Sequence, residues 1–161
     1  MATERKYLAT YIDAAFDTTY SATNYTLLGA DLEELSEELN PDVETVKNIL
    51  GESSVKHNGF EPSMDTDPYY YYKEDALAAK VRDIAMDRVT GDGCKTSLVQ
   101  VWLQPGLEGG APTCEAAWRE DVMIVPTSVG GDTSGIQIPF TVHFCGNRKK
   151  GTFDPETKKF T

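Results

Sequence analysis

The sequence predicts one α+β domain that is mainly β, a sandwich or barrel of antiparallel strands with a single helix inserted midway. Three observations predict this class. Residues 136–144 alternate between apolar and polar side chains, and this period of two indicates a half-buried strand. Residues 74–89 carry apolar side chains at helical spacing. The remaining apolar runs are short and are separated by turn residues.

The N-terminal residues 1–24 are polar and rich in Thr, Ala and Tyr. Their short apolar pattern is too weak to fold alone. We therefore expect an arm that becomes ordered against another surface, and we place the folded domain at residues 25–161. Within that domain, residues 25–28 (YTLL) predict a short strand that Gly29 closes.

Residues 32–50 allow two interpretations. Leu32, Leu35 and Leu39 have helical spacing, and Asp31 with Glu34 resembles a helix cap. However, Asn40-Pro41-Asp42 is a turn signal, and a β-branched run follows it. The residues alone therefore leave open a helix or a hairpin that turns at Asn40-Pro41-Asp42.

The next segments predict irregular structure. Residues 51–59 predict a polar loop, and residues 60–66 a short extended piece. Asp67-Pro68 predicts a turn, because a residue before proline avoids the helical region. The run of four tyrosines at 69–72 is either a stacking platform for sugars or bases, or packing and interface. The general enrichment of Tyr at interfaces favours packing or interface.

The helix at 74–89 is predicted from both its ends and its stripe. Acidic residues in the first turn and a basic residue in the last complement the helix dipole. A stripe of apolar residues should be buried, and a glycine ends the pattern. The acidic residues are Glu74 and Asp75, and the basic residue is Arg88. The apolar stripe is Leu77, Val81, Ile84 and Ala85, and the glycine is Gly91.

The C-terminal half predicts strands separated by glycine-rich loops. Residues 96–103 are apolar on both faces, which indicates a central or interfacial strand. The expected order is a strand at 96–103, a loop at 105–112, a strand at 115–125, a glycine-rich hairpin loop, a strand at 136–144, a basic turn at 147–151 and a terminal segment around 152–153.

The charge is negative and unevenly distributed. The 161 residues carry a formal net charge of −11, which argues against an ordinary nucleic-acid reader, since such a protein needs a basic face. Residues 31–52 hold eight acids against one base, whereas 143–161 hold five bases against two acids. These runs are either two solvated faces or the acidic and basic ends by which copies of the chain dock.

No chemistry-bearing motif stands out. Three distant cysteines, Cys94, Cys114 and Cys145, favour free thiols over disulfides or a zinc site. The two histidines, His57 and His143, have no nucleophile placed beside them by a local motif. No secretory signal or membrane span is predicted. We therefore expect a protein made and folded in a cytoplasm that is not an enzyme and holds no metal or cofactor.

Four segments together resemble the tail-tube (major tail) proteins of tailed bacteriophages, especially those of Gram-positive hosts and their prophages. The resemblance lies in the order and spacing of the segments and covers nearly all of the chain past residue 24. The segments are 28–52 (LGADLEELSEELNPDVETVKNILGE), 59–69 (GFEPSMDTDPY), 83–94 (DIAMDRVTGDGC) and 117–152, which contains AWREDVMIVPTSVGGDTSGIQIPFTVHFCGNRKKGT. The tyrosine run and the loop at 105–112 depart from the family pattern.

The resemblance implies a tail-tube fold of two packed antiparallel sheets flanked by one α-helix. It further implies homohexameric rings that stack head to tail into a hollow virion tail tube, through which DNA passes. It favours the hairpin for residues 32–50 and gives the N-terminal arm a role in assembly. The implied partners are other copies of the chain, the tape-measure protein and DNA transiently in the lumen, and a sheath protein if the tail is contractile.

Two sets of residues are candidate functional positions. Arg148, Lys149 and Lys150 are expected at an inter-subunit contact with acidic residues of a neighbour. Glu34, Ser36 and Glu38 form the polar side of an extended 32–39 segment and are expected to face the lumen, where their charge would repel phosphates. The alternatives are a monomeric β-sandwich binding module that uses the tyrosine run, and the tube subunit of a related contractile injection system.

Overall fold

The computed structural model describes residues 2–16, 25–29, 32, 34–66 and 68–161, and a seven-stranded antiparallel sheet lies at its centre. The strand order is β2-β1-β7-β8-β11-β6-β3. Their bounds are β1 Leu8–Asp13, β2 Tyr25–Leu28, β3 Glu37–Glu38, β6 Ser63–Thr66, β7 Lys95–Gln104, β8 Thr113–Pro126 and β11 Phe140–Gly151. The α+β, mainly β class predicted from the sequence is confirmed.

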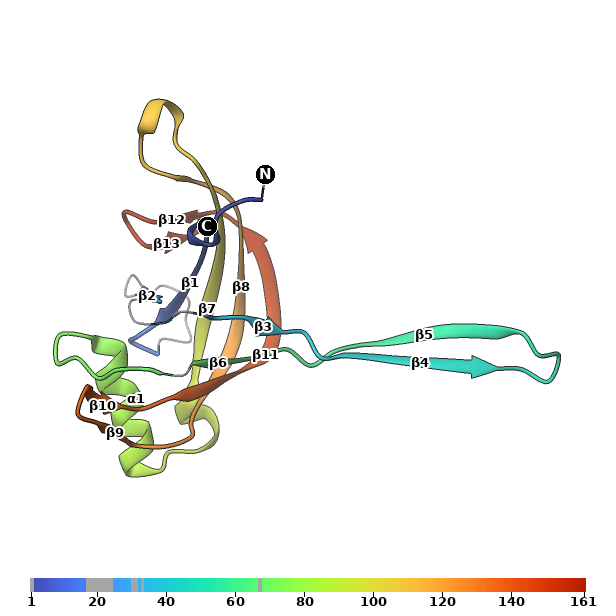
Figure 1. Ribbon diagram of the computed structural model, residues 1–161, viewed down its shortest axis with the longest axis horizontal. Coiled ribbons are helices and arrows are strands. Elements are labelled where there is room, and N and C mark those ends of the chain that lie inside the picture. The colour runs from blue at the N-terminus through green and yellow to red at the C-terminus, as the bar shows by residue number, and fades with distance from the viewer. Residues whose placement is uncertain (1, 17–24, 30–31, 33, 67) are drawn as a thin grey trace.

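Smaller elements surround this sheet (Figure 1). Three hairpins form separate two-stranded sheets: β4 Pro41–Lys47 with β5 Ser53–Phe60, β9 Gly130–Asp132 with β10 Gly135–Gln137, and β12 Phe153–Asp154 with β13 Lys159–Phe160. The described residues form one α-helix, α1 Ala76–Asp87, and short 3-10 helices at Arg5–Tyr7, Gly91–Cys94 and Leu107–Gly109.

The large sheet curls, so that it replaces the two separate packed sheets that were expected. Its central strands β7, β8 and β11 are 10, 14 and 12 residues long, and the twist between neighbouring strands accumulates across the sheet. A hydrogen bond from Arg5 Nη2 to the Leu35 carbonyl, 2.9 Å long, joins the 3-10 helix before β1 to the segment before β3.

Both faces of the sheet are covered by apolar side chains. Consecutive residues of a strand point to opposite faces, so Leu98 belongs to one cluster and Val99 to the other. The first cluster lies under α1 and includes Ile12, Leu77, Val81, Ile124 and Phe140. The second lies under the β12–β13 hairpin and includes Tyr11, Tyr25, Val101, Ala117 and Phe153. The expected central position of residues 96–103 is confirmed, because β7 lies between β1 and β8.

The helix is confirmed, with its first residue two positions later than expected. Asp75 is the N-cap, and its Oδ1 accepts a hydrogen bond from the Leu77 backbone N–H at 3.0 Å. The backbone N–H of Arg88, which has a left-handed conformation, donates to the Ile84 carbonyl and closes the helix. Leu77, Val81 and Ile84 are buried as expected.

The alternating strand is confirmed over its buried part but has different ends. Ile138, Phe140 and Val142 are buried, yet Pro139 interrupts the ladder, so that β10 and β11 are separate strands. The expected basic turn at 147–151 is wrong, because β11 continues to Gly151 and pairs with β8. Register shifts beside Gly146 accommodate the turn-like residues without ending the strand.

The expected hairpin turn at Asn40-Pro41-Asp42 is wrong, as is the expected loop at 51–59. Pro41 begins β4 and pairs with Phe60, residues 53–60 form β5, and the turn lies at residues 48–52. The side chain of Asn48 stabilises this turn, because its Oδ1 accepts hydrogen bonds from the backbone N–H groups of Leu50 and Glu52 at 2.9 and 3.0 Å. None of the described residues between 32 and 50 is helical.

The N-terminal prediction also needs correction. Residues 8–13, assigned to an arm, form β1, an inner strand that pairs with both β2 and β7. Five of its six residues are buried. Residues 17–24 of the expected arm lie outside the described residues. The short strand expected at 25–28 is confirmed as β2.

Candidate assembly surfaces

The β4–β5 hairpin extends away from the curled sheet as a long two-stranded ribbon (Figure 1). Within its two strands only Val46 and Gly59 are partly buried, and every other residue is exposed. A two-stranded hairpin without a covering layer is marginally stable in water. The described part of this chain provides no layer that covers the ribbon.

The exposed apolar side chains of the ribbon, Val43, Val55 and Phe60, gather on one face, which also carries the polar pair Lys47–Ser53 at its far end. Cross-strand partners share a face, so the pairs Val43–His57 and Thr45–Val55 lie on one side. The side chain of His57 lies against the Phe60 ring, with 4.7 Å between ring centroids, and extends this apolar face. The pairs Glu44–Lys56 and Val46–Ser54 lie on the other side. The ribbon is amphipathic even though both faces are open to solvent.

The tip of the ribbon presents two adjacent aliphatic side chains. Ile49 is 102% exposed and Leu50 is 77% exposed. Among the described residues they are the only two consecutive large apolar residues that are exposed. Asn48 fixes their backbone, and its Nδ2 also donates to Glu52 Oε2 at 2.9 Å. The tip is therefore a defined apolar knob.

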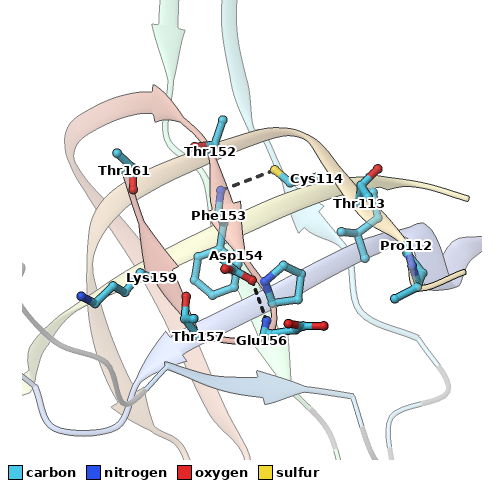
Figure 2. A pocket seen from close by; sticks show the side chains of 13 residues that line it. Pro112, Thr113, Cys114, Thr152, Phe153, Asp154, Glu156, Thr157, Lys159 and Thr161 are labelled. Atoms are coloured by element: carbon cyan, nitrogen blue, oxygen red, sulfur yellow. Dashed lines mark hydrogen bonds between the residues drawn. The ribbon is translucent and has the colours of Figure 1, made fainter. Parts of the chain in front are cut away.

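A groove of about 610 Å³ lies between the β12–β13 hairpin and residues 111–114 (Figure 2). Its apolar lining is Leu103, Ala111, Pro112, Cys114, Phe153 and Pro155. The Phe153 ring is held by Tyr11 and Tyr25, at centroid distances of 4.6 and 5.7 Å, and the Phe153 N–H donates to Cys114 Sγ at 3.5 Å. The groove is thus a preformed concave surface.

The three predicted contact residues Arg148, Lys149 and Lys150 lie in different surroundings. Arg148 Nη1 pairs with Glu120 Oε1 at 2.9 Å, and the Glu120 side chain is only 8% exposed. Arg148 and Lys150 both lie over the Trp118 ring, at 5.8 and 5.4 Å from its centroid. Lys149 is opposite Arg119 in the ladder and is exposed. Arg148 therefore has an acidic partner within its own chain, and Lys149 makes no ion pair with any described residue.

The predicted lumen-facing residues Glu34, Ser36 and Glu38 are all exposed. They lie just before and within the edge strand β3, whose partner is β6. Leu35 between them is buried, as the expected alternation requires. The alternation fails at Leu39, which is 50% exposed and lines a cavity of about 320 Å³ together with Ser36 and Trp102.

The tyrosine run at 69–72 mainly packs within the fold. Tyr69 is buried, its hydroxyl donates to Asp75 Oδ2 at 2.9 Å, and burial together with the charge of Asp75 raises its pKa. Arg82 Nη1 donates to the Tyr71 hydroxyl at 2.7 Å. Tyr70 forms a bridge with Gln137. These contacts favour packing over a stacking platform for sugars or bases.

The described residues offer little for catalysis. The three cysteines are free thiols. His57 and His143 are exposed on separate sheets. Within the described ranges, no group of three or more His, Cys, Asp or Glu side chains is arranged to hold a metal ion. No helix in the described part of the chain is long and apolar enough to cross a membrane.

Comparisons with known proteins identify the fold. No family model matches the sequence, and no curated protein matches it significantly. A chain from the tail of an empty GTA particle, refined with C6 symmetry, matches with a TM-score of 0.54 and 13% identity, covering 92% of this chain and 98% of that one. A chain from the PVC sheath-tube complex of an extracellular contractile injection system, in the extended state, matches with a TM-score of 0.47 and 10% identity, covering 94% and 92%. The first match shows that this chain has the fold of a tail-particle protein.

Proposed function

We propose that the protein is a structural subunit of a phage tail tube. Copies form hexameric rings, and the rings stack head to tail into the hollow tube through which DNA passes. The single observation that carries the proposal is the amphipathic β4–β5 ribbon, which the rest of the described chain leaves uncovered in a fold shared with a chain of a C6-symmetric tail. The earlier resemblance to tail-tube proteins of phages of Gram-positive hosts supports the same assignment.

The ribbon favours association because its apolar side chains are buried only by another molecule. Val43, Val55 and Phe60 are between 51% and 70% exposed in the single chain. Full burial of one such side chain stabilises a contact by about 1.5–3 kcal/mol. Covering this face therefore stabilises the contact with a neighbour by several kcal/mol, and the entropic cost of association opposes this gain.

Open sheet edges provide a second reason for association. Among the described residues, β2 and β3 each have a partner on one side only. The outer edge of β11 pairs with β6 only from Phe140 to His143, and no strand in the described part of the chain pairs with residues 145–151 on that side. Exposed edges are sites where chains pair, and a closed ring would satisfy them.

The lumen and its contents complete the proposal. Glu34, Ser36 and Glu38 face the channel, where repeated carboxylates repel phosphates and allow DNA to slide. The tape-measure protein occupies the same channel before DNA does, and a sheath protein surrounds the tube if the tail is contractile. Lys149, exposed and without an ion pair among the described residues, is the best remaining candidate for a contact with acidic residues of a neighbour.

Two adjacent residues on opposite faces of the ribbon provide the test. Val55→Asp places a charge on the apolar face, and Ser54→Asp places the same charge on the polar face. The wild-type protein should form rings or tubes in negative-stain micrographs at high protein concentration. We expect Val55→Asp to remain monomeric and Ser54→Asp to assemble. A wild-type protein that stays a 17.8 kDa monomer in light scattering would contradict the proposal and favour a binding module.

A further inference from the structure

We propose that the tip of the β4–β5 hairpin, formed by Ile49 and Leu50, inserts into the groove between β12–β13 and residues 111–114 of a neighbouring copy. This inference rests on the proposed function and specifies one of its contacts. It pairs the two highly exposed aliphatic side chains of the tip with a groove of about 610 Å³ whose floor is apolar.

The knob is shaped for insertion. Ile49 and Leu50 project from a turn that three hydrogen bonds to the Asn48 side chain hold in one conformation. A fixed turn loses little conformational freedom on binding, which favours association. These two highly exposed aliphatic side chains pack against no core of their own chain, because the ribbon carries them away from the curled sheet (Figure 1).

The groove is shaped to receive apolar groups. Its volume of about 610 Å³ lies within the range typical of ligand sites, roughly 300–1,000 Å³. Figure 2 shows the Phe153 ring between the β12–β13 strands and the segment at Pro112 and Cys114. Several polar groups around it are satisfied locally: Asp154 Oδ1 accepts from the Glu156 N–H at 2.9 Å, and Thr152 and Thr161 exchange two backbone hydrogen bonds. The apolar lining is therefore available for a guest.

Two other cavities, of about 420 and 320 Å³, are smaller than the groove. All three mix apolar and charged lining residues, among them Asp154, Glu156 and Lys159 in the groove and Arg5 in the other two. The larger volume is therefore what favours the groove.

The guest must belong to another copy. The seven residues of β4 extend the ribbon by about 23 Å at roughly 3.3 Å per residue, and Figure 1 shows it pointing away from β12–β13. A contact between a tip on one copy and a groove on the next joins two different surfaces. Such a heterologous contact repeats, and it builds a ring if the rotation closes or a filament if it does not.

A native cysteine in the groove makes the contact measurable in the full-length protein. Cys114 lines the groove and is partly exposed, Cys94 is buried, and Cys145 is exposed and is replaced by Ser. In this background, Ile49→Cys places a thiol on the tip. Diamide then takes two hydrogens from the two thiols and leaves a disulfide between copies. We expect a ladder of covalent oligomers on a non-reducing gel that disappears when Cys114 is also replaced by Ser.

Matched variants separate the possible results. Ser54→Cys, exposed on the polar face of the same ribbon, should give no ladder under the same conditions. Leu50→Asp should raise the concentration needed for assembly at least tenfold, with a monomer stability unchanged in urea denaturation. Rings or tubes that form normally from Ile49→Cys but give no Cys114-dependent ladder would overturn this contact and leave the proposed function standing. Failure of the wild-type chain to assemble would overturn both.

Discussion

Replacing Arg148 by methionine should destabilise the single chain, before any assembly takes place. The Arg148 guanidinium holds the Glu120 carboxylate at 2.9 Å, in a place where the Glu120 side chain is only 8% exposed. The methionine keeps the aliphatic stem over Trp118 but removes the charge. The carboxylate then loses its ion-pair partner in a largely desolvated place.

The magnitude follows from the burial of the two partners. Breaking a fully buried ion pair costs about 3–5 kcal/mol, whereas an exposed pair contributes only about 0–1 kcal/mol. Because the Arg148 side chain is 41% exposed, solvent screens part of the interaction. We therefore expect a loss of about 1–3 kcal/mol. For a chain of this size, that corresponds to a decrease of roughly 2–12 °C in Tm.

Urea denaturation at a protein concentration below assembly measures this loss directly. Lys149→Met is the matched control, because it removes the same charge at the next position, where the side chain is exposed and opposite Arg119. Its effect should stay within about 0.5 kcal/mol. Glu120→Gln should restore part of the stability of Arg148→Met, because a neutral amide is cheaper to bury. An Arg148→Met protein as stable as the wild type would refute the reasoning.

Three further predictions follow from single features of the fold. Deleting residues 1–24 removes the inner strand β1, so the product should lack a cooperative unfolding transition in circular dichroism, whereas deleting only the first four residues should preserve it. The pKa of Tyr69 is raised in the folded state by burial and by Asp75. The neutral Tyr69 side chain therefore contributes to the free energy of unfolding below about pH 10, and this contribution is lost as the pH rises further. Tyr69→Phe should reduce the loss of unfolding free energy above about pH 10, as measured by urea denaturation. Reversing the charges of Glu34 and Glu38 to Lys should leave assembly intact and slow DNA ejection from the phage, and a wild-type ejection rate would contradict a lumenal position.

The elements predicted correctly from the sequence are those whose signal is local and periodic. The helix carries its own cap at Asp75 and its own buried stripe, so nothing distant is needed to recognise it. The strand around Phe140 and Val142 has one buried face, and this produces a clear period of two. In β7, burial on both faces produces a nearly continuous apolar run, which indicates a central strand.

The N-terminal strand was missed because its surroundings, not its sequence, make it a strand. In β1, the polar residues Thr10 and Asp13 are buried together with Tyr11 and Ile12, so no alternation is visible. The Thr96 hydroxyl donates to the Asp13 carbonyl at 2.7 Å across 83 positions of sequence. A hydrogen bond over this separation has no local signature, and the segment resembles an arm until β7 is placed beside it.

The turn of the hairpin was predicted in the wrong place for a different physical reason. Asn40-Pro41-Asp42 has strong turn chemistry, yet proline is also acceptable at the first residue of an edge strand, and Pro41 occupies that position in β4. The actual turn depends on Asn48, whose side-chain hydrogen bonds replace the glycine-rich dipeptide of a tight hairpin. The Asn40 residue, with a φ of 45°, redirects the chain from β3 into the ribbon without closing a turn.

The same ribbon explains why residues 51–59 were read as a loop. A strand that packs on its own core alternates apolar and polar side chains, whereas β5 reads SSVKHNGF and is polar at most positions. Its few apolar residues, Val55 and Phe60, cannot satisfy a core, yet they suffice for one face of a contact with another molecule. Under the proposed function, a polar sequence that forms a regular, projecting strand pair limits the apolar side chains exposed on the single chain and reserves those few for a neighbour. The variants Val55→Asp and Ser54→Asp test this interpretation. They place the same charge at adjacent positions on opposite faces, so they should differ in assembly only if a neighbour covers the face that carries Val55.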